Sequence, residues 1–116
     1  MNLTRASEAP SYVAPLHRDV STVRLQGHEA GPTERFWVGL STYRPGGIAE
    51  NAAACEETVY VVLDGALVIT SEKAEMVLGR LDSVHVAKGE IRSIENRSSR
   101  DAVMLVVIAH PREGAA

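Results

Sequence analysis

The stretch Pro45–Thr70, PGGIAENAAACEETVYVVLDGALVIT, decides the fold class of this chain. It contains two apolar runs, TVYVVL and ALVIT, separated by Asp64-Gly65. Asp-Gly between two such runs predicts a tight hairpin, because a type I′ turn needs positive φ at both central residues. The first run alternates poorly, which predicts a strand buried on both faces, as in a closed double-layered barrel.

Further short segments rich in β-branched and aromatic residues extend this pattern on both sides. They are STVRLQ, RFWVGLSTY, AEMVLG, DSVHVAKG, IRSIEN and AVMLVVIAH. Turn residues separate them, with Lys88-Gly89 and residues 96–101 as further candidate turns, and no convincing amphipathic helix appears. Regular spacing of this kind predicts an all-β sandwich or barrel. The last segment is apolar almost throughout, which again predicts a strand buried on both faces.

The length of 116 residues suits one compact domain with its own hydrophobic core. Hydrophobic residues make up 45% of the chain, which is ordinary for a globular protein. Two prolines lie within the first fifteen residues, so we expect residues 1–15 to form an extended arm and residues 16–116 to form the barrel domain.

Charge and cysteine content narrow the classes of partner and compartment. A formal net charge of −3 argues against nucleic acid and membrane surfaces as partners. The N-terminus lacks the apolar core of a signal peptide, and the single cysteine, Cys55, fits a reducing compartment. We therefore expect a cytoplasmic protein.

Two glycine-bracketed patterns resemble the motifs of the cupin family of small jelly-roll barrels. Gly46 and Gly65 stand at the two glycine positions of the first cupin motif, and Gly89 and Asn96 match the second. The resemblance covers roughly residues 36–108. It implies a single-domain, cupin-like jelly-roll β-barrel.

The positions that hold a metal in that family carry other residues here, namely Ala52, Ala54, Thr58 and Arg92. Divalent transition metals need imidazole nitrogens or carboxylate oxygens that converge on one point. Two methyl groups, a hydroxyl and a guanidinium do not provide them, and the guanidinium repels cations. We therefore expect a metal-independent cupin without a cofactor.

Side-chain alternation along a strand predicts the lining of the interior. The resemblance places Thr58 toward the interior, so Tyr60, two residues later, should face it as well. Arg92 enters the same cavity from the facing strand, and Ala52 and Ala54 leave space where the family has imidazoles. The expected result is a pocket with a fixed positive charge and two hydroxyls that suits a small anionic metabolite.

The partner of Arg92 decides what this pocket does, because an unpaired buried charge is very costly. In one interpretation, a carboxylate or phosphate of the ligand binds the guanidinium through bidentate hydrogen bonds. In the other, Arg92 forms an internal ion pair with Glu50, Glu56 or Glu57, or reaches the barrel mouth. Only the first interpretation predicts anion binding.

Several other residues are candidates for the site. Glu57, Glu50 or His28 could move a proton, and His28 lies in a glycine-containing segment that could cover a barrel mouth. Tyr43 and Trp37 share one face of their strand, and we include both among the substrate-binding candidates. Cys55, beside two glutamates, is expected to be an unreactive cysteine.

Two functions from different classes follow. The first is a cofactor-free enzyme of the isomerase, lyase, hydratase or cyclase type, in which Arg92 stabilises a developing negative charge. The second is a non-catalytic cupin that binds a small molecule or has a purely structural role. We favour the enzyme, because Ala52 and Ala54 leave the cavity open. Small cupins resemble one another in forming dimers, and the arm could cross to a partner, so we expect a homodimer.

Overall fold

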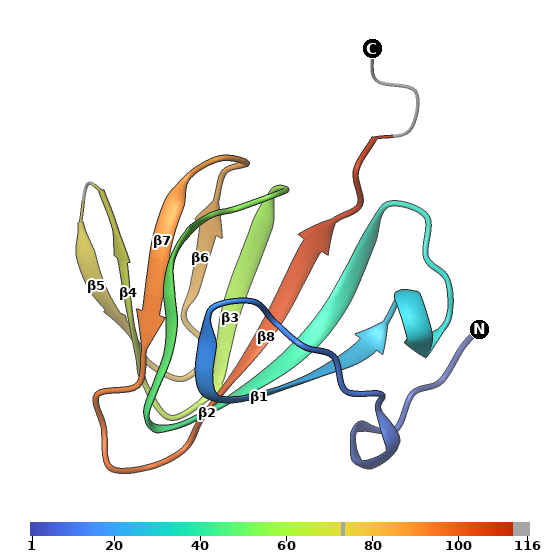
Figure 1. Cartoon of the computed structure of the whole chain (residues 1–116). Coiled ribbons are helices and arrows are strands. Elements are labelled where there is room, and N and C mark those ends of the chain that lie inside the picture. The colour runs from blue at the N-terminus through green and yellow to red at the C-terminus, as the bar shows by residue number, and fades with distance from the viewer. Residues whose placement is uncertain (73, 113–116) are drawn as a thin grey trace.

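The computed structural model describes residues 1–72 and 74–112 and shows an all-β protein (Figure 1). The strands are β1 (His17–Gln26), β2 (Phe36–Ala53), β3 (Thr58–Asp64), β4 (Leu67–Ser71), β5 (Glu75–Leu78), β6 (Ser83–Val86), β7 (Ile91–Glu95) and β8 (Ala102–Ala109). Two short 3-10 helices, η1 (Ala6–Glu8) and η2 (His28–Ala30), complete the elements. All the strands predicted from the sequence are present. No helix of the described residues is long and apolar enough to cross a membrane.

The strands form a nearly closed antiparallel jelly-roll barrel. They are joined in the order β5-β4-β7-β2-β8-β3-β6, and β1 pairs with β2 outside this path. The long strand β2 connects the two walls, because its first part pairs with β8 and its last part with β7. Gly46, with φ 81°, lies between these two parts. This change of partner places the end of β2 beside β7, in the other wall of the barrel.

The predicted hairpin at Asp64-Gly65 is wrong. Strand β3 pairs with β6 and β8, whereas β4 pairs with β5 and β7, so the turn crosses from one wall to the other. Gly65 has φ 77°, but Asp64 does not have positive φ, so the turn is not type I′. A Cβ on Gly65 would lie 2.8 Å from the Asp101 carbonyl oxygen, so glycine permits the close crossing of two segments.

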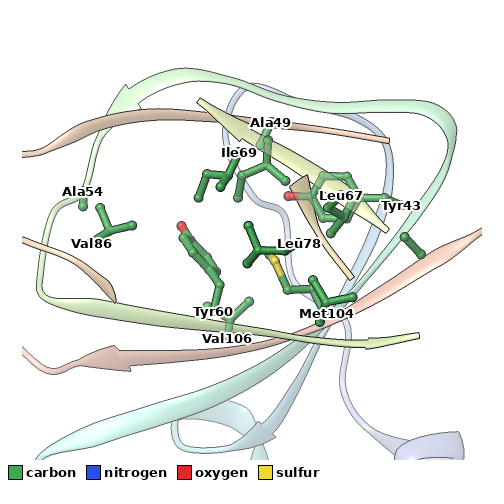
Figure 2. Close-up of a cluster of buried hydrophobic side chains, with 13 residues drawn as sticks. Tyr43, Ala49, Ala54, Tyr60, Leu67, Ile69, Leu78, Val86, Met104 and Val106 are labelled. Carbon is green, nitrogen blue, oxygen red and sulfur yellow. The ribbon is translucent and has the colours of Figure 1, made fainter. Parts of the chain in front are cut away.

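Along β3 and β8, side chains that point into the barrel interior alternate with side chains on the outer face (Figure 2). Thr58, Tyr60 and Val62 are buried, as the sequence predicts, while Val59 and Val61 between them are only half-buried. Strand β8 repeats the pattern, with Met104 and Val106 among its buried residues. The prediction that both strands are buried on both faces is therefore confirmed for the inner faces, whereas the outer faces are only half-buried.

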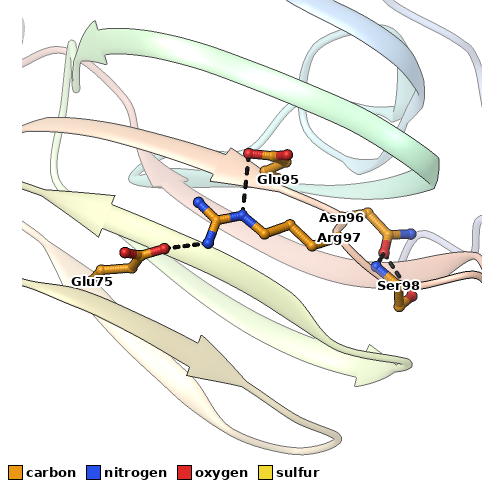
Figure 3. A network of polar contacts seen from close by, with 5 residues as sticks. All are labelled: Glu75, Glu95, Asn96, Arg97 and Ser98. Carbon is orange, nitrogen blue, oxygen red and sulfur yellow. Dashed lines mark hydrogen bonds and ion pairs between the residues drawn. The ribbon is translucent and has the colours of Figure 1, made fainter.

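A buried asparagine holds the turn between β7 and β8 (Figure 3). The Asn96 side-chain amide donates to the carbonyl oxygens of Tyr43 (2.9 Å) and Arg100 (2.7 Å). Its Oδ1 accepts from the backbone N–H of Ser98 at 2.9 Å. Asn96 is fully buried, so these bonds satisfy an otherwise costly amide and fix the backbone of β2 at Tyr43. The neighbouring Arg97, which bonds Glu75 and Glu95, is exposed and adds little stability.

The N-terminal segment lies along its own barrel. Backbone bonds join Arg24 N to Pro10 O (2.8 Å) and Tyr12 N to Thr22 O (3.1 Å) beside the edge of β1. The Asn2 side chain donates to the carbonyl oxygen of Ala30 at 2.7 Å. The N-terminal segment therefore lies along a strand edge of its own chain, where it blocks pairing of that edge with another strand.

Candidate functional site

The barrel encloses a cavity of about 340 Å³. Strands β2, β3, β7 and β8 form its walls, and residues 12–17 close one side of its mouth. The lining includes seven residues selected from the sequence: Trp37, Tyr43, Ala52, Ala54, Thr58, Tyr60 and Arg92. Two others, His28 and Glu57, are not among its lining residues. The volume lies at the lower end of the range of small-molecule sites.

Arg92 projects from β7 and meets two neutral oxygens. Its Nε–H donates to the Tyr60 hydroxyl oxygen at 3.0 Å, and its Nη1 donates to the carbonyl oxygen of Glu50 at 3.2 Å. Register explains the approach, because Arg92 lies directly opposite Ala52, whose methyl leaves room for the guanidinium. The remaining N–H groups of the half-buried guanidinium can bind a ligand.

The glutamates that were candidates for an internal ion pair with Arg92 have other partners. Glu50 pairs with Arg18 at 3.2 Å, Glu56 with Lys88 at 3.6 Å, and Glu57 with His85 at 2.7 Å. Within residues 1–72 and 74–112, no carboxylate lies within ion-pairing distance of Arg92. The internal ion pair is therefore absent from this arrangement.

Tyr43 contributes a hydroxyl that has no hydrogen-bond partner among the described residues. Its side chain is fully buried, lines the cavity and points into the barrel (Figure 2). Of the buried side-chain polar atoms in the described residues, only the Tyr43 hydroxyl lacks a hydrogen bond. Burial raises the pKa of Tyr43 well above its ordinary value; the nearby Tyr60 adds to this effect and Arg92 opposes it. The hydroxyl therefore stays protonated and offers a hydrogen to an acceptor in the cavity.

Aromatic rings and a second arginine form the mouth. The Arg24 guanidinium lies 3.8 Å from the ring centroid of Tyr12 and 4.2 Å from that of Trp37. The two rings meet edge to face, with centroids 5.5 Å apart. All three residues line the cavity, so cation–π contacts attach the N-terminal segment to the barrel at this point.

The four residues at the cupin metal positions do not fit a divalent metal. Ala52 and Ala54 offer methyl groups, Arg92 offers a cation, and the Thr58 hydroxyl donates to the carbonyl oxygen of Glu56 at 2.9 Å. No group of three or more His, Cys, Asp or Glu side chains suited to a metal occurs among the described residues. No chemical step in this cavity is therefore assigned to a metal.

The structure does not bring Glu57 and His28 together with Arg92. The Glu57 carboxylate bonds His85 on the outside of the barrel, where both side chains are more than half exposed. His28 is exposed in η2, with its ring 5.5 Å from Trp37 and 5.2 Å from His110.

Besides Cys55 and Glu56, four lining residues with polar side chains were not selected as site residues from the sequence: Tyr12, His17, Arg24 and Ser41. The N-terminal segment or the strand that follows it supplies the first three. Side-chain alternation could have identified one of the four, because Ser41 lies between Trp37 and Tyr43 on the same face of β2. Glu56 also lines the cavity and is the one acidic residue among the described residues that do so.

Comparison with known proteins gives one close relative and many structural neighbours. The chain is 71% identical over 111 residues to "Beta-D-galactosidase Rv1717" of Mycobacterium tuberculosis, covering 96% of each chain. No family model matches it.

Two solved structures illustrate the similarity of fold. The polyketide cyclase RemF of Streptomyces resistomycificus superposes with a TM-score of 0.84 at 16% identity, covering 97% of this chain and 82% of that one. A sugar phosphate isomerase of the cupin superfamily from Silicibacter pomeroyi gives 0.73 at 23% identity, covering 89% and 70%. At these identities the two structures are evidence of the fold alone.

Proposed function

The chain belongs to the cupin superfamily and to the same family as the mycobacterial protein named a beta-D-galactosidase, and on this premise we propose that its barrel cavity hydrolyses a small β-D-galactoside. The observation that carries the proposal is the surplus of hydrogen-bond donors in the cavity. The Tyr43 hydroxyl has no acceptor among the described residues, and Arg92 uses two of its five N–H groups on neutral oxygens. A sugar supplies several acceptor oxygens at once.

The two ends of the cavity differ in a way that suits a glycoside. Tyr43, Tyr60 and Arg92 give the barrel interior its polar groups, whereas Tyr12 and Trp37 place aromatic rings at the mouth. Polar groups orient a ligand and apolar rings pack against it, and most small-molecule sites combine the two. We infer that the galactoside lies between these two kinds of group, with its oxygens toward Tyr43, Tyr60 and Arg92 and its apolar surface against the rings of Tyr12 and Trp37.

Hydrolysis needs a proton donor for the leaving oxygen. Most glycosidases use a pair of carboxylic acids, whereas this lining contains one acidic residue, Glu56, which is paired with Lys88. Tyr60 offers another donor. Because Arg92 donates to the Tyr60 oxygen, the Tyr60 hydrogen is free to point elsewhere, and the guanidinium would stabilise the phenolate that remains.

A second candidate keeps the interior but changes the ligand. Arg92 has neutral partners, so a ligand carboxylate or phosphate could supply the opposite charge through bidentate bonds. The protein would then be a cofactor-free isomerase, lyase, hydratase or cyclase acting on a small organic anion. A non-catalytic binding protein for the same anion is the corresponding third case.

Turnover of nitrophenyl β-D-galactopyranoside by the purified protein tests the first proposal, with the α-anomer and the β-D-glucoside as matched substrates. We expect hydrolysis of the β-D-galactoside that a chelator leaves unchanged, and loss of this activity in Arg92→Ala but not in the surface control Arg97→Ala, since Arg97 bonds only Glu75 and Glu95 among the described residues. Absence of hydrolysis, together with calorimetric binding of a small carboxylate that Arg92→Ala removes, would replace it by the second proposal.

A further inference from the structure

We propose that His17 is the general base of the cavity, with its Nε2 accepting a proton from the attacking water. The inference rests on the proposed hydrolysis and adds a catalytic residue to it. Neither the cupin motifs nor the metal positions include His17, which precedes both in the chain.

The position of His17 satisfies the first requirement of a base, which is access to the ligand. His17 is the first residue of β1, is half-buried and lines the cavity together with Arg92 and Tyr43. Its ring centroid lies 6.4 Å from that of Tyr43. Of the four histidines in the chain, His17 is the one that lines this cavity.

A backbone contact fixes the tautomer. The His17 Nδ1 lies 2.7 Å from the carbonyl oxygen of Pro15. A carbonyl only accepts hydrogen bonds, so Nδ1 carries the hydrogen and Nε2 presents a lone pair. Among the hydrogen bonds of residues 1–72 and 74–112, none uses this Nε2. A neutral imidazole held in this way is a competent proton acceptor.

Unusual backbone conformations hold His17 in place. Leu16 has φ 59° and Asp19 has φ 54°, both in the left-handed region that non-glycine residues rarely adopt. The pairing of β1 with β2 is also irregular between Arg18 and Val20. The bond from Glu50 N to Leu16 O, at 2.9 Å, secures the strained segment. Strain of this kind concentrates at functional sites, because the fold sustains it to aim a side chain.

The surroundings of His17 favour the neutral ring. Burial lowers its pKa below 6.5; the Pro15 carbonyl opposes this effect and the positive charge of Arg92 adds to it. Arg92 faces the ring from β7 and Tyr43 from β2, while the carboxylate of Glu50 is bound by Arg18 at 3.2 Å. His17 therefore accepts protons throughout the neutral range.

In the proposed hydrolysis, Tyr60 is the acid that protonates the leaving oxygen. The water oxygen forms a bond to the anomeric carbon, and the bond from that carbon to the leaving oxygen breaks, with its electron pair on the leaving oxygen. The leaving oxygen takes the Tyr60 hydrogen, and the attacking water gives a hydrogen to His17 Nε2. Transfer of that proton to the Tyr60 phenolate, directly or through solvent, restores both residues. The net change is one glycoside and one water converted to galactose and an alcohol.

Two variants test the role. His17→Asn keeps a short amide that can still donate to the Pro15 carbonyl but removes the base, and His17→Gln places an amide near the former Nε2. His85→Gln is the matched control, since His85 lies on the outer surface. The measurements are kcat, KM and the pH profile for nitrophenyl β-D-galactopyranoside, with melting temperatures to confirm folding.

We expect both variants to lose about 10²- to 10⁴-fold in kcat with little change in KM, and to lose the acidic limb of the kcat/KM profile. Added imidazole should restore part of the His17→Asn activity. An active wild type whose His17 variants keep kcat within about threefold, with an unchanged acidic limb, overturns the role of His17 alone. A wild type that binds galactose without hydrolysing any β-D-galactoside overturns the proposed function and this role with it.

Discussion

Arg92 and Tyr60 are joined across the barrel interior by a 3.0 Å hydrogen bond in which the charged group donates to a neutral oxygen. The bond orients the phenol without neutralising the guanidinium. The positive charge in the cavity therefore remains available to a ligand.

Truncation of Arg92 should separate binding from stability. No described carboxylate pairs with Arg92, so Arg92→Ala leaves no glutamate stranded and should change the melting temperature little. Ligand binding should weaken by about 2–5 kcal/mol if a charge-assisted contact is lost. Arg92→Lys should recover only part of this, because an ammonium lacks the planar fork. Calorimetry and thermal melts measure the two effects; a sharp fall in melting temperature with intact binding would contradict the arrangement.

Removal of the Tyr43 hydroxyl should not destabilise the fold, unlike the removal of most buried polar groups. The hydroxyl has no hydrogen-bond partner in the described part of the chain, so Tyr43→Phe should leave the melting temperature unchanged or raise it. Ligand affinity should fall by about 1 kcal/mol, or roughly fivefold, because a donor to the ligand is lost. Ser41→Ala provides a second cavity variant for comparison. A destabilised Tyr43→Phe with normal affinity would show that the hydroxyl serves the fold rather than the ligand.

Stability should fall in acid partly through His17. Its folded pKa is lowered below the unfolded value of 6.5, so the unfolded chain takes up the proton first. The contribution is fully present above 6.5 and is lost as the pH falls from there through the lowered folded pKa. In His17→Gln, the fall in melting temperature between about pH 7.5 and pH 5 should be smaller. An unchanged slope in that window would refute the neutral, buried ring.

We propose the outer face of the barrel as the contact surface of the expected homodimer. Six half-buried aliphatic side chains lie in neighbouring register positions of β2, β8 and β3: Val38, Leu40, Val59, Val61, Leu105 and Val107. The sequence pattern of β3 and β8 predicts burial on both faces, and a second copy packed here would complete it. Light scattering should give twice the mass of the chain, and Leu105→Glu should give the monomer. A monomeric wild type at micromolar concentration would exclude the dimer.

Periodicity predicted the strands, because alternation is a local property. The cupin resemblance placed Thr58 toward the interior, and alternation then gave the inward direction of Tyr60. It placed Trp37 and Tyr43 on one face without deciding which, since that depends on the opposite wall. The Asp64-Gly65 turn was recognised but its strand partners were not, because a turn signal does not record which strands pair. His17 carries no local signal: its place follows from the left-handed Leu16 and the course of the N-terminal segment.

The cavity mouth is built partly from residues 12–17, which are held to the barrel by backbone hydrogen bonds and by the cation–π contacts of Arg24 with Tyr12 and Trp37. The shape of the mouth therefore depends in part on residues that lie outside the buried core. Substitutions in residues 12–17 should therefore alter which ligands the cavity admits while the jelly roll keeps its core. Affinity tags or truncations at this end should therefore be tested for their effect on ligand binding in the cavity, even where the melting temperature is unchanged.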